Sequence, residues 1–370
     1  MDQGVTRSTD APAPGEARAV RDPVARRMRR RDRRRADLAV LLVVGVLLMA
    51  AFAAGGITLY HAFYGPSAFV ERYVGLLAEG RAADALEVPG VRVDSTELAA
   101  AGLPETASDA LLRRDALSAM GDIEVVDEQV TDDGVAVTLS YRSGSYTGTS
   151  TYLVDRNGWA GVVPAWRFVE SPLAVLDVTV NGSMSFEVNG FTLDKRQISP
   201  LGADADPLES MSMLVFSPGR YRVAVDTVIS STRGVDVLAD VPLAGVGVEV
   251  NAEPTEQFVS VVQDEVDDFL DACAEQQVLQ PTACPFGYVL RNRIASLPSW
   301  SIRDYPVVEL VPDGADWAVP STAGVAHLEV DELSLFDGTV RPLSEDVPFA
   351  LSADVALQPD GTVSIRVSSG

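Results

Sequence analysis

The sequence predicts an α+β multidomain chain. It would have a single transmembrane helix and then two domains that each join helices to a curved antiparallel sheet, one on either side of a small all-β domain. An uncharged apolar run covers residues 38–60. Helical periodicity opens residues 61–170 and again residues 253–370, and strand-like alternation follows it in both stretches. Between them, residues 171–252 alternate without a helical period, which is typical of β-structure.

Charge divides the chain into two parts. The 370 residues include 29 basic and 53 acidic side chains, for a formal net charge of −24. Residues 1–37 hold 11 arginines and 6 acidic residues, a net of +5, so the remainder carries −29. A chain this acidic is not expected to bind nucleic acid. Residues 1–37 lack an apolar period, which predicts a disordered basic cytoplasmic tail.

The apolar run over residues 38–60 is the predicted transmembrane helix. Its 23 residues carry no charge, and at about 1.5 Å per residue they span a hydrocarbon core of roughly 30 Å. An arginine-rich segment stands directly before the run, so the positive-inside rule places residues 1–37 in the cytoplasm and residues 61–370 outside the cell. This topology signal consists of Arg26, Arg27, Arg29, Arg30, Arg31, Arg33, Arg34 and Arg35.

The predicted localisation is therefore the cell membrane, as a single-pass protein with an extracytoplasmic part. We expect the arginines of the tail to contact anionic lipid headgroups as well. A cleaved export signal is the alternative, because Ala51-Phe52-Ala53 resembles a cleavage site. The apolar run exceeds the usual signal length of about 7–15 residues, which favours a retained anchor.

The first exported domain is predicted over residues 61–170. Apolar residues recur at helical spacing from Phe69 to Leu77, and a second helix is predicted from Thr106 to Met120. Strand-like alternation follows, and the dipeptides Asp133-Gly134 and Asn157-Gly158 predict hairpin turns.

The other two predicted domains cover residues 171–252 and 253–370. Residues 171–252 alternate around Asn181-Gly182 and Asn189-Gly190, which predicts the small all-β domain. Residues 253–370 open with an amphipathic helix from Phe258 to Cys273, and strand-like runs follow.

The two cysteines of the chain fall in this last domain. Cys273 and Cys284 are eleven positions apart, and in an oxidising compartment such a pair is predicted to form a disulfide. Two buried thiols are the alternative. No further cysteine pair or nearby histidine completes four zinc ligands, so no metal site is predicted.

Short motifs carry a resemblance to known families. The stretches Pro66–Tyr73 and Leu77–Leu86 resemble the opening helix and acidic turn of the nuclear-transport-factor-two-like cone fold, which implies that both helix-and-sheet domains are cone-like. The stretches Val178–Gly182 and Phe216–Tyr221 resemble motifs of small extracytoplasmic β domains. The order of anchor, cone-like, β and cone-like domains is similar to TcaA-type envelope proteins of Gram-positive bacteria. That resemblance implies a role in the envelope or in wall stress, although residues 1–37 lack the cysteines of the family's zinc ribbon.

No catalytic or cofactor-binding residue is predicted, and no cofactor. The nucleophile elbow, the zinc-protease helix, the P-loop and the dinucleotide fingerprint are all missing from the sequence. His327 shares one face of a predicted strand with Glu329 and Asp331, an arrangement that could serve as a general acid/base.

The predicted function is therefore non-enzymatic. It is that of a single-pass bacterial membrane protein whose exported domains bind or scaffold an envelope protein or wall component. Two alternatives remain open: an exported enzyme that uses a cone-fold pocket around His327, and a membrane-anchored stress sensor.

Overall fold

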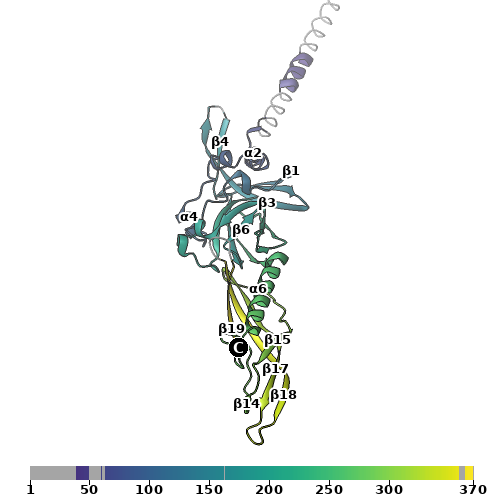
Figure 1. Ribbon diagram of the computed structural model, residues 1–370. Coiled ribbons are helices and arrows are strands. Elements are labelled where there is room, and N and C mark those ends of the chain that lie inside the picture. The colour runs from purple at the N-terminus through teal and green to yellow at the C-terminus, as the bar shows by residue number, and fades with distance from the viewer. Residues whose placement is uncertain (1–38, 50–59, 61–62, 162, 358–362, 370) are drawn as a thin grey trace, which may run out of the picture. The chain divides into compact units, whose positions relative to one another are not determined.

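The computed structural model describes residues 39–49, 60, 63–161, 163–357 and 363–369 (Figure 1). The chain divides into two compact units, Met1–Phe63 and Tyr64–Gly370, and each is described by itself. Strands make up 45% of the described residues and helices 22%. The chain is thus mostly β-sheet with several separate sheets, and the predicted α+β class with a transmembrane helix and two cone-like domains is wrong.

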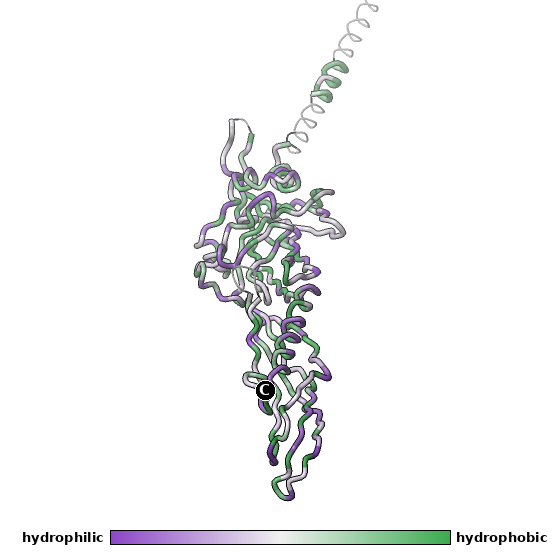
Figure 2. The backbone as a smooth tube through the Cα atoms, in the orientation of Figure 1, coloured by the Kyte–Doolittle hydropathy of each residue, from purple (hydrophilic) through white to green (hydrophobic). Residues whose placement is uncertain are grey.

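The first unit contains part of the apolar run. Residues 39–49 form a helix, which Figure 2 colours as hydrophobic. Among the residues that the structure describes, no helix is both long and apolar enough to cross a membrane. This finding contradicts the predicted membrane-spanning helix over residues 38–60, and with it the single-pass localisation and the extracytoplasmic placement of residues 61–370.

The second unit opens with short helices. α2 (Pro66–Ala78) has proline in its first turn, where no backbone N–H is needed, and it buries an apolar face. α3 (Ala82–Leu86) follows. In α4 (Ser95–Ala100) the side chain of Asp94 accepts from the backbone at the helix start, which closes a capping box.

A four-stranded antiparallel sheet follows these helices in sequence order. Its strands are β1 (Gly121–Thr131), β2 (Gly134–Ser143), β3 (Tyr146–Ala160) and β4 (Val163–Phe168). The hairpin predicted around Asp133-Gly134 joins β1 to β2, but its two loop residues are Asp132 and Asp133, and Gly134 is the first residue of β2. The turn predicted at Asn157-Gly158 is wrong, because the two residues lie inside β3. The register shifts there, and Gly158 has a φ of 80°, a value that glycine adopts readily in a bulge.

The helix predicted from Thr106 to Met120 is also wrong. The only helical turn described in that segment is the 3₁₀ turn η1 (Arg114–Ala116). Ser108 instead bonds to a strand: its N–H donates to the carbonyl of Ser212 at 2.9 Å, and its carbonyl accepts from the N–H of Leu214 at 2.8 Å. Leu111 and Ala116 are fully buried. The apolar spacing therefore reflects packing against a sheet rather than a helix.

Two small sheets make up the middle of the unit. One has the order β12-β5-β8, and β12 is parallel to β5; the other has the order β11-β9-β6-β7. A two-stranded ladder of β10 and β13 stands beside them, with the short turns α5 and η2. The bounds are β5 (Leu173–Asn181), β6 (Ser185–Val188), β7 (Phe191–Asp194), α5 (Lys195–Ile198), η2 (Gly202–Asp204), β8 (Met211–Phe216), β9 (Gly219–Ala224), β10 (Ser230–Ser231), β11 (Val235–Ala239), β12 (Gly245–Asn251) and β13 (Glu253–Pro254).

β5 supplies side chains to two hydrophobic cores. Successive side chains of a strand point to opposite faces. Leu173 and Val175 join the core formed with α2 and β2, whereas Leu176 and Val178 join the core formed with α6 and the last sheet. The central sheet is thus buried on both faces, which explains the nearly continuous apolar sequence of β5.

The last part of the chain is one helix on a six-stranded sheet. The predicted helix is confirmed as α6 (Glu256–Ala274), which Thr255 caps through its side chain. The apolar face of α6 joins the core formed by the strands. These strands are β14 (Arg293–Ile294), β15 (Ser299–Asp304), β16 (Val311–Asp313), β17 (Asp316–Leu333), β18 (Val340–Leu357) and β19 (Val363–Ser369).

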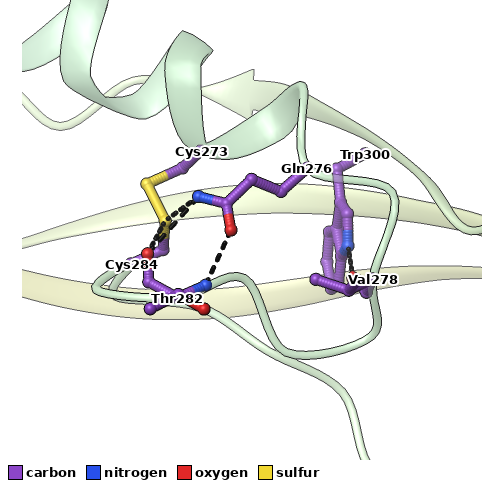
Figure 3. The surroundings of a disulfide bond; sticks show 6 residues. All are labelled: Cys273, Gln276, Val278, Thr282, Cys284 and Trp300. Carbon is purple, nitrogen blue, oxygen red and sulfur yellow. Dashed lines mark hydrogen bonds between the residues drawn. A yellow bond between two sulfur atoms is a disulfide. The ribbon is translucent and has the colours of Figure 1, made fainter.

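A disulfide between Cys273 and Cys284 closes the loop that follows α6 (Figure 3). The Cα atoms of the two cysteines are 5.8 Å apart. Within the loop, the side-chain amide of Gln276 donates to the carbonyl of Thr282 at 3.3 Å and accepts from its N–H at 2.8 Å. The indole N–H of Trp300 donates to the carbonyl of Val278 at 2.8 Å, which attaches the loop to β15.

Candidate functional site

The sequence-predicted residues do not come together in one site. The eight arginines of the topology signal lie outside the described residues. The two cysteines form the disulfide described above. His327 lies on β17 in a cluster of polar side chains, and a second cluster, which the sequence analysis did not identify, lies on β9.

The His327 cluster joins two neighbouring strands. His327 on β17 pairs with Asp346 on β18, and the two side chains meet at 2.6 Å between Nδ1 and Oδ1. The other ring nitrogen, Nε2, is 3.1 Å from Oγ of Ser344. Glu329 is farther away, with 3.8 Å between its Oε1 and Nε2 of His327. A serine, a histidine and an aspartate therefore form a continuous chain of hydrogen bonds.

The surroundings of these three hydrogen-bonded residues differ from those of a hydrolytic triad. In such a triad the aspartate is buried and pairs with the histidine alone. Asp346 is 44% exposed and also pairs with Arg303. Arg303 is the main cause, and His327 the second, of the lowered pKa of Asp346. A shallow depression of about 400 Å3 lies beside the cluster, and Glu329 and Ser344 line it but His327 does not. The cluster is an open strand surface whose groups are paired with one another.

The second cluster depends on the alternation of β9. Tyr221 and Val223 point into the core and are buried. Arg220 and Arg222 alternate with them and therefore point to the opposite face. Two guanidinium groups are thus placed side by side on one strand, in a chain whose overall charge is −24.

A groove of about 460 Å3 passes over these arginines. One wall is the segment between η1 and β1, which is distant in sequence, and the other is the end of β6 with the turn that follows it. The groove, named here the arginine groove, is lined by Leu117, Ser118, Ala119, Glu187, Asn189, Gly190, Arg220, Arg222 and Ala224.

Asn189 fastens the two walls to the floor. Its side-chain amide donates to the carbonyls of Ala116 at 2.8 Å and Arg220 at 3.0 Å. Its side-chain oxygen accepts from the N–H of Arg222 at 2.9 Å. Asn189 has a φ of 52°, a left-handed conformation that asparagine tolerates better than most residues. The arginine groove is therefore held in shape by hydrogen bonds that do not use the guanidinium groups.

The charges in the groove are incompletely paired. Asp236 on β11 lies between the two arginines, but its oxygens are 3.7 Å from Nη1 of Arg220 and 3.6 Å from Nη1 of Arg222. Both distances exceed those of charge-assisted hydrogen bonds, which are about 2.7–2.9 Å. Arg220 Nε and Asp236 Oδ1 are buried and have no hydrogen-bond partner among the described residues. Arg222 Nη2 does donate to the carbonyl of Arg233. A buried donor without a partner is uncommon in proteins, and a bound oxyanion would satisfy Arg220 Nε.

The sequence contained one signal for this site. Gly219-Arg220-Tyr221-Arg222 shows two arginines at strand spacing beside an aromatic residue. That pattern places both guanidinium groups on one face. The pattern does not show that residues 117–119 cover the face that carries the two arginines. Those residues are about a hundred positions away in the sequence, inside the helix predicted from Thr106 to Met120.

Comparisons with known proteins identify no relative. No family model matches the chain, no curated protein matches it, and no solved structure matches it. The resemblance to TcaA-type envelope proteins therefore stays a prediction.

Proposed function

We propose that this chain is a binding or scaffolding protein without catalytic activity, and that it holds a partner by an anionic group seated in the arginine groove. The observation that carries the proposal is the unpartnered Nε of Arg220 beneath a groove of about 460 Å3. A carboxylate or phosphate group is the chemistry that a guanidinium recognises, through parallel N–H···O bonds.

The energetic basis of binding is local. Hydrogen bonds to charged groups contribute about 1.5–3 kcal/mol each. Hydrogen bonds from the two guanidinium groups to a bound anion would replace the long contacts that these groups now make with Asp236. Salt screens the guanidinium groups, so anion binding should weaken as the ionic strength rises. A carboxylate and a phosphate share this chemistry, and titration with each distinguishes them.

The test is isothermal titration calorimetry with inorganic phosphate and, separately, with malonate. We expect at least one of them to bind, and we expect Arg220→Gln to weaken that binding tenfold or more, about 1.4 kcal/mol. Arg81→Gln is the matched control, because Arg81 is an exposed arginine in ion pairs with Glu79 and Asp84 outside the groove. Equal affinity in both variants and the unmodified chain would contradict the proposal.

Hydrolysis by Ser344 is the second candidate, because the hydrogen-bonded order of Ser344, His327 and Asp346 matches that of a nucleophile, a base and an orienting acid. A fluorophosphonate probe tests it directly. Covalent labelling at Ser344 that is lost in His327→Ala would favour an enzyme; an unlabelled protein would leave the cluster as a set of cross-strand hydrogen bonds.

A further inference from the structure

The floor of the arginine groove carries a carboxylate as well as two guanidinium groups. Glu187 on β6 pairs directly with Ala224 on β9, and both residues line the groove. Residues that are paired in this way point to the same face of a sheet. Glu187 therefore lies on the face that carries Arg220 and Arg222. The groove has a negative end as well as a positive one.

The carboxylate of Glu187 is half-buried and is held by a neutral donor. Its Oε1 accepts from the hydroxyl of Thr192 at 3.2 Å. The guanidinium of Arg222 lies near Asp236 instead, and it donates to the carbonyl of Arg233. Within the described part of the chain, Glu187 thus forms no ion pair. A carboxylate in this position is suited to a ligand that brings its own positive charge.

The formal charges around the groove add up to zero. Arg220 and Arg222 are positive, whereas Asp236 and Glu187 are negative. A ligand with negative charge alone would be attracted by the arginines and repelled by the carboxylates. A zwitterion would instead match both ends. The residues that line the walls add no charge: Leu117, Ser118, Ala119, Asn189 and Gly190.

The spacing of the two ends sets the length of the ligand. Ala224, the neighbour of Glu187, is two positions from Arg222 and four positions from Arg220 along β9. At about 3.4 Å per residue, the two arginines start roughly 7 and 14 Å from the negative end. An α-amino acid carries its ammonium and carboxylate on a single carbon atom and is too short to join the two ends. An extended tripeptide is about 10 Å long and fits the interval.

We propose that the ligand of the arginine groove is a short peptide with both ends free, about three residues long. Its terminal carboxylate binds the guanidinium groups and accepts from the unpartnered Nε of Arg220. Its terminal ammonium donates to the carboxylate of Glu187. This inference rests on the anion binding proposed above, and it names the class of molecule that carries the anion.

The test is isothermal titration calorimetry of the full chain with peptides that differ only at their ends. Trialanine has both charges, N-acetyltrialanine lacks the ammonium, and trialanine amide lacks the carboxylate. We expect trialanine to bind about tenfold or more tightly than either blocked peptide. Because this comparison uses the unmodified chain, it does not depend on the folding of a variant.

Glu187→Gln assigns the ammonium to its partner. We expect this variant to lose about tenfold in affinity for trialanine. Its affinity for N-acetyltrialanine should stay equal or rise, because a repelling carboxylate is gone. Arg220→Gln should weaken the binding of both peptides. Glu71→Gln, at an exposed carboxylate of α2 outside the groove, is the matched control and should change neither affinity.

The outcomes separate this inference from the proposed function. If phosphate or malonate binds through Arg220 but acetylation does not weaken the binding of trialanine, the groove binds anions and the peptide ligand is overturned. The same holds if Glu187→Gln keeps the full preference for a free ammonium. If neither anion nor any peptide binds, the proposed function fails, and this inference fails with it.

Discussion

Lys195 and the Arg220–Arg222 pair are both cationic sites of the middle β segment, and the fold treats them in opposite ways. Lys195 is fully buried, and its ammonium donates to the carbonyl of Val180 at 2.6 Å and to that of Pro207. Arg220 is partly exposed, and its Nε has no partner among the described residues. The structure thus uses the donors of the lysine and leaves one buried donor of Arg220, its Nε, without a hydrogen-bond partner. A cation of the first kind holds the fold together, whereas a cation of the second kind is suited to a ligand.

The electrostatic environment of Lys195 agrees with a structural role. Burial lowers the pKa of its ammonium, and Asp206 and Glu209 partly oppose that effect. It is also the only lysine of the chain. Its contacts join β5 to the loop before β8, two segments that are separated in the sequence by β6, β7, α5 and η2.

The largest effect is expected for Lys195→Met, which keeps the length of the side chain and removes the ammonium. The carbonyls of Val180 and Pro207 would lose their charged donor, and we expect the free energy of unfolding to fall by about 2–4 kcal/mol. Urea unfolding measures this loss. Phosphate affinity, measured by calorimetry at a temperature where the variant is folded, should stay within about twofold. Unchanged stability, or a parallel loss of affinity, would break the distinction between the two cations.

A middle-sized effect is expected for Asp236→Asn, a substitution beside the arginine groove. The carboxylate now neutralises part of the charge that an anion would meet, at 3.6–3.7 Å from both guanidinium groups. Its removal should tighten phosphate binding about tenfold, or about 1.4 kcal/mol, as calorimetry would show. Asp226→Asn, an exposed carboxylate after β9, is the control. Weaker binding by Asp236→Asn would mean that Asp236 positions the arginines rather than competing for them.

The strands of the middle segment were predictable because two local signals agree there. Alternating apolar residues mark the strand interior, and Asn189-Gly190 marks a turn that both residues can enter with positive φ. The helix expected from Thr106 to Met120 failed because the same apolar spacing also suits a segment that lies on a sheet. Periodicity reports which residues are buried, and it does not report where the backbone hydrogen bonds go.

The candidate site was less predictable than the fold for a related reason. His327, Glu329 and Asp331 share a strand face, as alternation predicts, but Ser344 and Asp346 reach His327 only through the pairing of β17 with β18. The arginine groove likewise depends on a wall that arrives from another part of the chain. Sequence patterns place side chains on faces, whereas tertiary pairing decides which faces meet.

The smallest effect is expected for Asp346→Asn in the His327 cluster. This substitution is to be set against those at Lys195 and beside the Arg220–Arg222 pair. Arg303 first and His327 second lower the pKa of Asp346 in the folded state. A carboxyl group with a lowered pKa adds stability above its unfolded value of about 3.9, and this contribution is lost as the pH falls through the folded value. The group is exposed and screened by solvent, so its contribution is small. Thermal unfolding midpoints should therefore differ between Asp346→Asn and the unmodified chain at pH 6, and the difference should shrink as the pH falls below about 3.9. Asp354→Asn, farther along β18, is the control for replacing an exposed carboxylate on that strand. A difference that does not change with pH would mean that the ion pair with Arg303 and the bond to His327 add nothing to stability, and would contradict this prediction.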